Sequence, residues 1–168
     1  LPNKAAQPTE APTQQAKTTQ AAPTEQPTPE PDPVQQLLEE MTLEQKVGQL
    51  FLVRPDSLDL SQTQDQINDA KADGVTELTD AMRQTLAEYP VGGVVIFGKN
   101  LESPQQITQF LDDLQQASDT PLFTAIDEEG GLVARLANNA AFDLPQYESA
   151  AAVGTSGNPE DARAMGRT

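Results

Sequence analysis

The chain has 168 residues and a formal net charge of −16, and it contains neither Cys nor His. The acidic balance argues against nucleic acid or an anionic membrane as a partner, because both require a basic surface. The missing residue types exclude disulfides, thiolate or histidine metal sites, and Ser–His or Cys–His catalysis within these residues. No apolar run reaches the roughly 20 residues that span a bilayer, so we expect no transmembrane segment.

Residues 1–33 differ in composition from the rest of the chain. Eight of the 14 prolines lie here, among Thr, Gln and Ala, with no Gly or aromatic residue. Such a segment cannot bury enough apolar surface to offset the entropy lost on ordering, so we expect a stiff, disordered tether. Tethers of this kind often hold an exported domain clear of a cell surface, which predicts an extracellular or surface-tethered protein; the same composition also fits an inter-domain linker.

Residues 34–78 open with two helical patterns. Apolar residues recur at helical spacing over 34–41, and Thr42 with Gln45 forms a capping-box signature for a second, short helix. Residues 48–53 fit either that helix or a first strand, which Arg54 and Pro55 would end. The polar segment 54–76 is expected to be a loop with one helical turn.

The next segment predicts a helix followed by a buried strand. Residues 79–88 read as a helix with Met82, Leu86 and Tyr89 on its inner side, ended by Pro90. Residues 91–97 (VGGVVIF) are apolar throughout, which indicates a strand covered on both faces. The Gly92–Gly93 pair lies within this strand and lacks a phosphate-loop pattern, so it is expected to allow close packing.

The last part of the chain repeats this order. Ser103, Pro104 and Gln106 form a strong helix start, and the apolar run 122–126 predicts a buried third strand. A loop-rich passage follows, up to a helix opened at 158–159 that stops without a terminator, which suggests a truncated chain. Strands that alternate with helices predict an α/β fold with a parallel sheet, and three strands are too few to close a barrel.

Asp127 is the best candidate for a functional residue, because it follows directly on the third predicted strand. Polar groups at the carboxyl ends of parallel strands are enriched in binding sites. Its two oxygens could accept hydrogen bonds from neighbouring hydroxyls of a sugar, or they could cap backbone amides of their own turn. Arg135 could neutralise Asp127 in an ion pair or donate to a ligand.

The residues between Asp127 and Arg135 have structural alternatives as well. Side chains of the adjacent Glu128 and Glu129 diverge, so they should not act as an acid/base pair on one bond, and we expect one to be structural and one solvated. Gly130 and Gly131 could let backbone approach a ligand or could supply a turn with positive φ.

Three blocks of sequence resemble a known family. MTLEQKVGQLFLV (41–53), YPVGGVVIFGKN with the following SP (89–104), and above all PLFTAIDEEGGLVARL (121–136) resemble the N-terminal part of glycoside hydrolase family 3. The likeness is greatest to its β-N-acetylhexosaminidase branch, where a D-x-E-G-G-x-V-x-R element follows the third barrel strand. It covers residues 34–168, which we take as a domain separate from the tether.

The resemblance implies a fold and an activity. The fold would be the N-terminal part, about three βα units, of a TIM (β/α)8 barrel, and the reaction would be retaining hydrolysis of terminal β-linked N-acetylglucosaminides, such as those derived from peptidoglycan. No metal or organic cofactor is expected. Carried over by position, Asp127 and Arg135 would bind the sugar in the −1 subsite, and Glu129, Gly130 and Gly131 would shape it.

The chain also departs from the branch. There the nucleophile is an Asp near a late strand and the acid/base is a His on a mobile loop; this chain has neither element, so the fragment alone is expected to hold no catalytic residue and to be inactive. Leu132 stands where the branch often has Arg. Two alternatives stay open: a non-catalytic carbohydrate-binding or scaffold half-barrel, and a family 3 β-glucosidase or β-xylosidase. The sequence does not indicate an oligomeric state.

Overall fold

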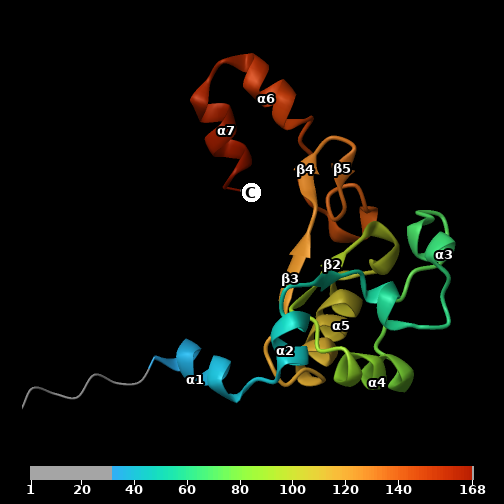
Figure 1. Ribbon diagram of the computed structural model, residues 1–168. Coiled ribbons are helices and arrows are strands. Elements are labelled where there is room, and N and C mark those ends of the chain that lie inside the picture. Colours follow the sequence, from blue (N-terminus) through green and yellow to red (C-terminus); the bar gives the residue numbers. More distant parts are fainter. Residues whose placement is uncertain (1–31, 168) are drawn as a thin grey trace, which may run out of the picture. The chain divides into compact units, whose positions relative to one another are not determined.

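The computed structural model describes residues 32–167 (Figure 1). The elements in chain order are α1 (Pro33–Glu40), α2 (Leu43–Gly48), β1 (Leu52–Val53), η1 (Pro55–Leu58), α3 (Gln64–Asn68), α4 (Asp80–Glu88), β2 (Gly93–Ile96), η2 (Gly98–Asn100), α5 (Pro104–Gln116), β3 (Phe123–Ile126), β4 (Glu128–Gly130), β5 (Val133–Ala134), η3 (Ala140–Phe142), α6 (Ala150–Ser156) and α7 (Pro159–Met165). All but the last two positions of the predicted tether, residues 1–33, lie outside the described residues.

Three strands form a parallel sheet in the order β1–β2–β3, as the alternation of strands and helices predicts (Figure 1). Gly93 at the start of β2 pairs with Leu52 of β1 and with Phe123 of β3. The connection from β1 to β2 includes α4, and α5 connects β2 to β3. Because the strands run in the same direction, their carboxyl ends lie along one edge of the sheet, which we call the carboxyl edge.

The first turns of the helices follow the predicted capping signals. Thr42 and Gln45 form the predicted capping box at α2, each side chain accepting the other residue's backbone N–H. Ser103 accepts a hydrogen bond from the backbone N–H of Gln106 at the start of α5, with Pro104 at the first helical position. These caps satisfy amides that have no partner inside the helix, which explains why the helices begin at these residues.

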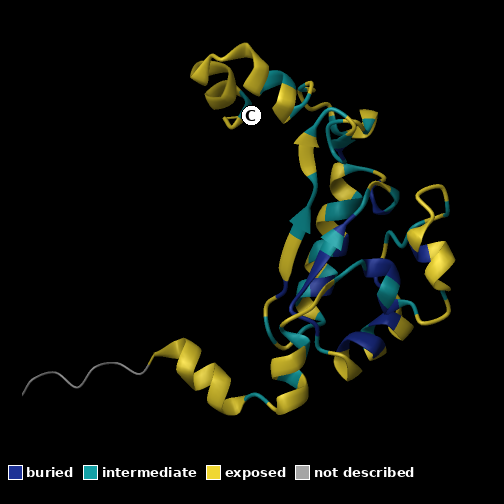
Figure 2. Cartoon of the chain, turned by 45° about the horizontal axis from the view of Figure 1, so that its top comes forward, coloured by how far each residue is buried: buried dark blue, intermediate teal, exposed yellow. Residues whose placement is uncertain are grey.

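The core lies between β2 and the helices α4 and α5. Its buried side chains come mainly from these three elements: Met82, Leu86, Val94, Ile96, Phe110 and Leu114. Each contributes roughly 1.5–3 kcal/mol by leaving water. The prediction that β2 is covered on both faces is confirmed (Figure 2). Tyr89 does not join this core, because it lies past the last turn of α4 with 54% of its surface exposed.

The prediction of a buried third strand is wrong for β3: two of its four residues are exposed and two are half-buried. Leu122 just before it is buried, but Phe123 is 73% exposed and Thr124 is exposed as well. The reason is that β3 pairs with β2 on one side, and no strand within residues 32–167 pairs with its other side. Helix α1 is similarly exposed along its whole length (Figure 2).

The glycine pair in and before β2 allows close approach of neighbouring backbone, as predicted. A Cβ atom on Gly92 would lie 2.3 Å from the carbonyl oxygen of Gln49, and one on Gly93 would lie 2.3 Å from that of Phe123. Both distances are far below a tolerable contact, so a side chain at Gly92 would displace the end of α2, and one at Gly93 would push β2 and β3 apart.

Two segments hold more structure than the sequence predicts. The segment 54–76 contains η1 and α3 rather than one helical turn, and α3 starts at a capping box of Thr63 and Gln66. Beyond Arg135, the predicted helix at 158–159 is confirmed as α7, but η3 and α6 precede it. Among the helices of residues 32–167, none combines the length and the apolar character needed to cross a membrane.

Candidate functional site at the carboxyl edge

Asp127 lies directly after β3, where the sequence predicts it. An ion pair joins its Oδ2 atom to Nη2 of Arg135 at 3.6 Å, and 48% of its side chain is exposed. Its backbone carbonyl accepts a hydrogen bond from the Arg135 backbone N–H at 3.2 Å. Within the described residues the carboxylate caps no amide of its own turn, so it retains the capacity to accept hydrogen bonds from a ligand.

Arg135 is the residue directly after β5, and its side chain lies beside Asp127. Its side chain is 29% exposed, and its guanidinium carbon lies 5.5 Å from the centroid of the Phe97 ring. The Nε atom is buried and has no hydrogen-bond partner among the described residues. The predicted ion pair with Asp127 is therefore confirmed, and it is loose enough for both groups to turn toward a ligand.

Glu128 is the structural member of the predicted pair of acids. Its carboxylate accepts hydrogen bonds from the backbone N–H groups of Leu136, at 2.8 Å, and Ala137, at 3.0 Å. These bonds close the turn after β5 and occupy both oxygens. Glu128 thus holds the hairpin of β4 and β5 in shape and is not placed to act on a substrate.

Glu129 is the solvated member of the pair, and it forms a bulge. In the antiparallel hairpin, Glu128 pairs with Ala134 and Gly130 pairs with Val133, so Glu129 is the extra residue of β4. Its side chain is exposed. A bulge at this point bends the strand immediately after Asp127 and carries the chain away from the sheet.

Gly130 and Gly131 supply the turn with positive φ that was one of the two predicted alternatives. Their φ values are 85° and 63°, a region that side chains of L-residues rarely adopt. A Cβ atom on Gly131 would also lie 2.7 Å from the carbonyl oxygen of Glu148. Whether the two glycines also shape a sugar site stays a prediction.

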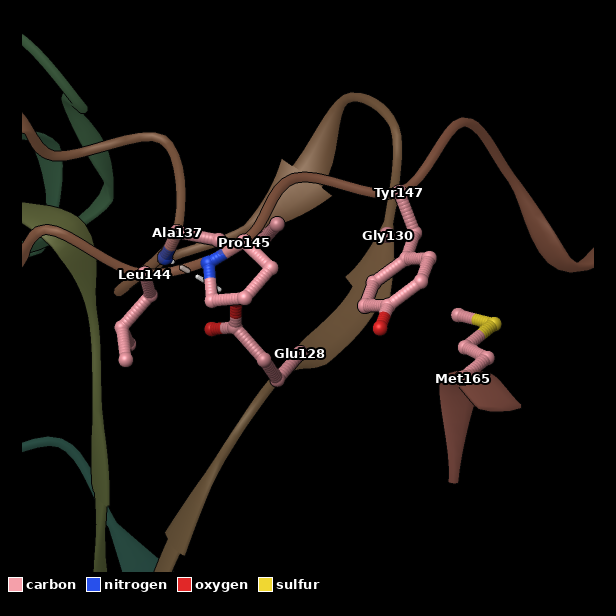
Figure 3. A pocket seen from close by; sticks show the side chains of 8 residues that line it. Glu128, Gly130, Ala137, Leu144, Pro145, Tyr147 and Met165 are labelled. Carbon is pink, nitrogen blue, oxygen red and sulfur yellow. Dashed lines mark hydrogen bonds between the residues drawn. The ribbon is translucent and has the colours of Figure 1, made fainter. Parts of the chain in front are cut away.

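A small pocket of about 130 Å³ lies beside this hairpin (Figure 3). Glu128 and Gly130 of the hairpin line it together with Tyr147 and Met165 from the segment that follows (Figure 3). Neither Asp127 nor Arg135 belongs to its lining. The pocket is therefore separate from the predicted sugar-binding pair.

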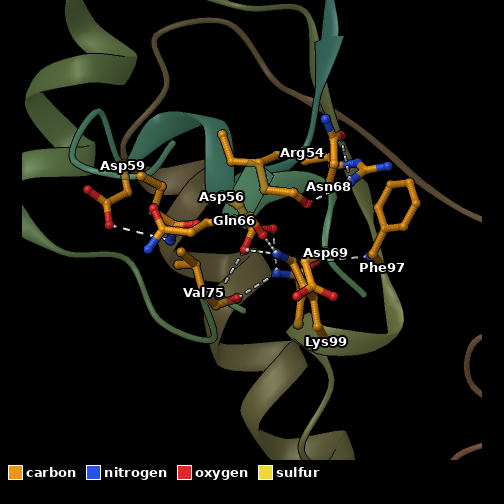
Figure 4. A network of polar contacts seen from close by, with 12 residues as sticks. Arg54, Asp56, Asp59, Gln66, Asn68, Asp69, Val75, Phe97 and Lys99 are labelled. Atoms are coloured by element: carbon orange, nitrogen blue, oxygen red, sulfur yellow. Dashed lines mark hydrogen bonds and ion pairs between the residues drawn. The ribbon is translucent and has the colours of Figure 1, made fainter. Parts of the chain in front are cut away.

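A buried polar network occupies the ends of β1 and β2 (Figure 4). The Asp56 carboxylate, fully buried, forms an ion pair with Nζ of Lys99 at 3.3 Å. It also accepts hydrogen bonds from Nδ2 of Asn100, at 3.0 Å, and from the backbone N–H of Val75, at 3.1 Å. The network ties the segment 54–76 to the residues that follow β2.

An aromatic ring lies between this network and Asp127. This ring belongs to Phe97, the residue after β2. The guanidinium carbon of Arg54 lies 3.9 Å from its centroid, and the guanidinium carbon of Arg135 lies near the same ring. Arg54 follows β1 and donates a hydrogen bond to the carbonyl oxygen of Ile67 at 2.8 Å. The carboxyl edge therefore carries two guanidinium groups on one ring, next to the carboxylate of Asp127.

The sequence reasoning did not assign these further residues at the edge. Arg54 and Phe97 follow directly on β1 and β2, which is the same signal that identified Asp127, and Lys99 and Asn100 lie in the turn η2 just beyond β2. Asp56 could have been suspected for the same reason. Taken together, the exposed part of the edge offers one carboxylate as acceptor and adjacent guanidinium donors, a set that can bind neighbouring hydroxyl groups.

Comparison with known proteins identifies relatives of this chain. The family described as "Glycosyl hydrolase family 3 N terminal domain" matches residues 42–168. A "Beta-hexosaminidase" of Bordetella avium is 38% identical over 69 residues, which are 41% of this chain and 20% of that protein. A "Beta-hexosaminidase" of Thiobacillus denitrificans is 33% identical over 92 residues, 55% of this chain and 25% of that protein.

A solved structure shows the same arrangement. A glycoside hydrolase family 3 beta-N-acetylglucosaminidase from Paenibacillus sp. str. FPU-7 superposes with a TM-score of 0.54 and 31% sequence identity, over 73% of this chain and 20% of that one. The chain thus spans between a fifth and a quarter of the length of these relatives. The comparison confirms the predicted fold, the N-terminal part of a (β/α)8 barrel.

Proposed function

This chain belongs to glycosyl hydrolase family 3, and we propose that it supplies the sugar-binding carboxyl edge of a retaining β-N-acetylhexosaminidase. The reaction of the whole protein would be hydrolysis of terminal β-linked N-acetylglucosaminides through a covalent glycosyl-enzyme. The observation that carries the proposal is the Asp127 carboxylate, which lies half-exposed at the end of β3 with one loose ion pair to Arg135.

Asp127 and Arg135 have complementary parts in this proposal. The carboxylate accepts hydrogen bonds from two neighbouring sugar hydroxyls, and the guanidinium donates to a sugar oxygen. Their separation of 3.6 Å exceeds the ~2.7–2.9 Å of a direct charge-assisted hydrogen bond. A ligand therefore does not have to break a tight bond before it binds.

The bond-breaking groups are proposed to lie outside these 168 residues. Glu128 uses both carboxylate oxygens for backbone amides, and Glu129 is its direct neighbour, so the two do not face each other across a glycosidic bond. The chain contains no His that could act as the acid/base. Alone, the chain should bind a sugar weakly and hydrolyse nothing.

The substrate class is proposed from the names of the relatives. Both bacterial relatives are described as beta-hexosaminidases, which favours N-acetylhexosaminides over glucosides or xylosides. Peptidoglycan fragments are a bacterial source of terminal N-acetylglucosamine that fits this class. The Pro-, Thr- and Gln-rich composition of residues 1–33 supports an exported, surface-tethered bacterial enzyme.

Hydrolysis assays on the complete product of the reading frame that encodes this chain test the proposal. We expect release of 4-nitrophenol from the β-N-acetylglucosaminide at a kcat/KM at least about 100-fold above that for the β-glucoside or β-xyloside, because a site built for the acetamido group leaves polar groups unpaired with the other sugars. Preference for the glucoside or xyloside would contradict the substrate class. Hydrolysis of none of the three, with N-acetylglucosamine still bound, would support a non-catalytic carbohydrate-binding protein instead.

A further inference from the structure

Phe97 makes contacts that the sugar-binding proposal leaves unexplained. Its ring is approached by two guanidinium groups, that of Arg54 at 3.9 Å and that of Arg135 at 5.5 Å from the centroid. Two like charges repel each other, and the negative face of an aromatic ring offsets part of that repulsion. The ring therefore stabilises two cations at this edge, in addition to the Asp127 carboxylate that pairs with Arg135.

Phe97 is itself fixed by the buried network. Oδ1 of Asn100 accepts the backbone N–H of Phe97 at 3.0 Å, and the same side chain donates to Asp56 and to the carbonyl oxygen of Val75 (Figure 4). Asn100 is fully buried. Phe97 belongs neither to the hydrophobic core nor to the apolar residues packed against it. Its half-buried ring is thus held in place from the backbone side, with its face directed to the arginines.

The two arginines differ in how they are held. Arg54 is tied down by its hydrogen bond to the Ile67 carbonyl oxygen at 2.8 Å. Arg135 has only the 3.6 Å ion pair with Asp127 and the Phe97 ring to fix its guanidinium, and its buried Nε has no partner within the described residues. Without the ring, the Arg135 guanidinium would keep only its partly solvated ion pair with Asp127 among the contacts of residues 32–167.

We propose that Phe97 is a positioning residue, which holds the Arg135 guanidinium beside Asp127, and that Arg54 stacks on the same ring and keeps it in place. The expected effect of Phe97 on substrate binding rests on the proposed function. The placement of Arg135 is a property of the free chain, however, and can be tested without any substrate. Phe97 itself acts through Arg135 and not on the sugar.

The first test reads the arginine side chains directly. The Nε–H signals of the ¹⁵N-labelled chain are assigned by Arg→Lys substitution, and Phe97→Leu is compared with Phe97→Tyr. A proton near an aromatic face is shifted by the ring current, so we expect the Arg54 and Arg135 signals to move in Phe97→Leu and to stay within line width in Phe97→Tyr. Phe142→Leu is the matched control, because Phe142 is also half-buried and packs against the core.

An unchanged Arg135 signal in Phe97→Leu would overturn the proposal, and so would an equal change in Phe142→Leu. The first result would mean that the ring does not hold Arg135. The second would mean that any loss of packing has the same effect. Neither result depends on whether the protein hydrolyses a glycoside.

The second test is a double-mutant cycle in the complete protein. Phe97→Leu should raise KM for the N-acetylglucosaminide about three- to tenfold with a smaller change in kcat, the range expected from one cation–aromatic contact. In an Arg135→Lys background the same substitution should add less than about twofold, because the group it positions is already altered. Full additivity would contradict the proposal. If the wild-type protein hydrolyses no glycoside, the proposed function fails, and the arginine signals alone decide the role of Phe97.

Discussion

The two ends of the carboxyl edge show opposite ways of using charged residues. At the ends of β1 and β2, Asp56 and Lys99 form an ion pair whose side chains are 0% and 6% exposed. At the end of β3, Asp127 and Arg135 form a pair whose side chains are 48% and 29% exposed. Among residues 32–167, hydrogen bonds from the Val75 amide and from Asn100 enclose the first pair, whereas the charged groups of the second pair have no such further bonds.

This difference separates scaffold from site. A buried ion pair is costly to break, because removal of one partner leaves a charge in the interior without compensation. An exposed pair contributes about 0–1 kcal/mol, and its partners remain free to exchange it for contacts with a ligand. The molecule thus fixes the segment 54–76 with the first pair, fixes the Phe97 backbone through Asn100, which is bonded to that pair, and leaves the second pair available for binding.

The same substitution at the two ends tests this comparison most strongly. Asp56→Asn should lower the free energy of unfolding by about 3–5 kcal/mol, because the Lys99 ammonium group then stays buried opposite an uncharged amide. Asp127→Asn, the matched control, should lower it by less than about 1 kcal/mol. Urea unfolding followed by far-UV circular dichroism measures both values. Losses of equal size would remove the distinction between the two ends.

A smaller effect is expected where β2 and β3 meet. Gly93→Ala should destabilise the chain by about 1–3 kcal/mol, because the new Cβ would lie 2.3 Å from the Phe123 carbonyl oxygen and would force the strands apart. Gly98→Ala is the control, since nothing lies within 4 Å of a Cβ built there. Thermal melts of the two variants should differ clearly; coincident melts would show that the strands can separate at little cost.

The turn after Asp127 should show a still smaller effect. Gly131→Ala combines a positive φ with a Cβ that would lie 2.7 Å from the Glu148 carbonyl oxygen, whereas Gly157→Ala has the positive φ alone. Each substitution carries a strain of about 1 kcal/mol from its backbone conformation, and Gly131→Ala should exceed this by the cost of the contact. Amide hydrogen exchange at Val133 and Ala134 should increase only in Gly131→Ala. Equal exchange in both variants would mean that the contact is relieved by local movement.

The smallest effect concerns a surface carboxylate in the segment 54–76. Hydrogen bonds from the hydroxyl and the backbone N–H of Ser61 lower the pKa of Asp59 below its ordinary value. The folded chain therefore binds fewer protons at Asp59 than the unfolded chain, and the resulting stability is present above about pH 4 and is lost as the pH falls through the lowered folded-state pKa. Ser61→Ala should thus destabilise the chain slightly at pH 6 and less at pH 3. An identical difference at both pH values would exclude this linkage.

The sequence predicts the elements that local signals determine. Capping residues such as Thr42 and Ser103 mark helix starts, and the apolar runs mark strands, because both patterns arise from neighbouring residues. Asp127 could be identified because it follows a strand, and Arg135 because it lies on the same short D-x-E-G-G-x-V-x-R element, residues 127–135. The sequence predicts that one of Glu128 and Glu129 is structural and the other solvated, but it does not show which residue has which role.

Other features depend on contacts between distant segments. Asp56 and Asn100 are 44 positions apart, and nothing in the local sequence shows that a buried pair will form there. The exposure of Phe123 depends on which strands neighbour β3, and not on the composition of β3 itself. The β4–β5 hairpin is too short and too polar to show a strand pattern, since its form is determined by the Glu128 hydrogen bonds and the glycine turn.

The central claim, that the Asp127 carboxylate binds the sugar, is tested most directly by the steady-state kinetics of an Asp127→Asn variant of the complete protein with an N-acetylglucosaminide. The control is Asp119→Asn, which changes the charge by the same amount at a position before β3. Loss of charge-assisted hydrogen bonds to the sugar predicts a fall in kcat/KM of about 10- to 100-fold for Asp127→Asn. The Asp119 variant should match the wild type, and both variants should melt within a few degrees of it. Wild-type kinetics for Asp127→Asn would show that this carboxylate does not bind the substrate, and the account of the carboxyl edge would be wrong.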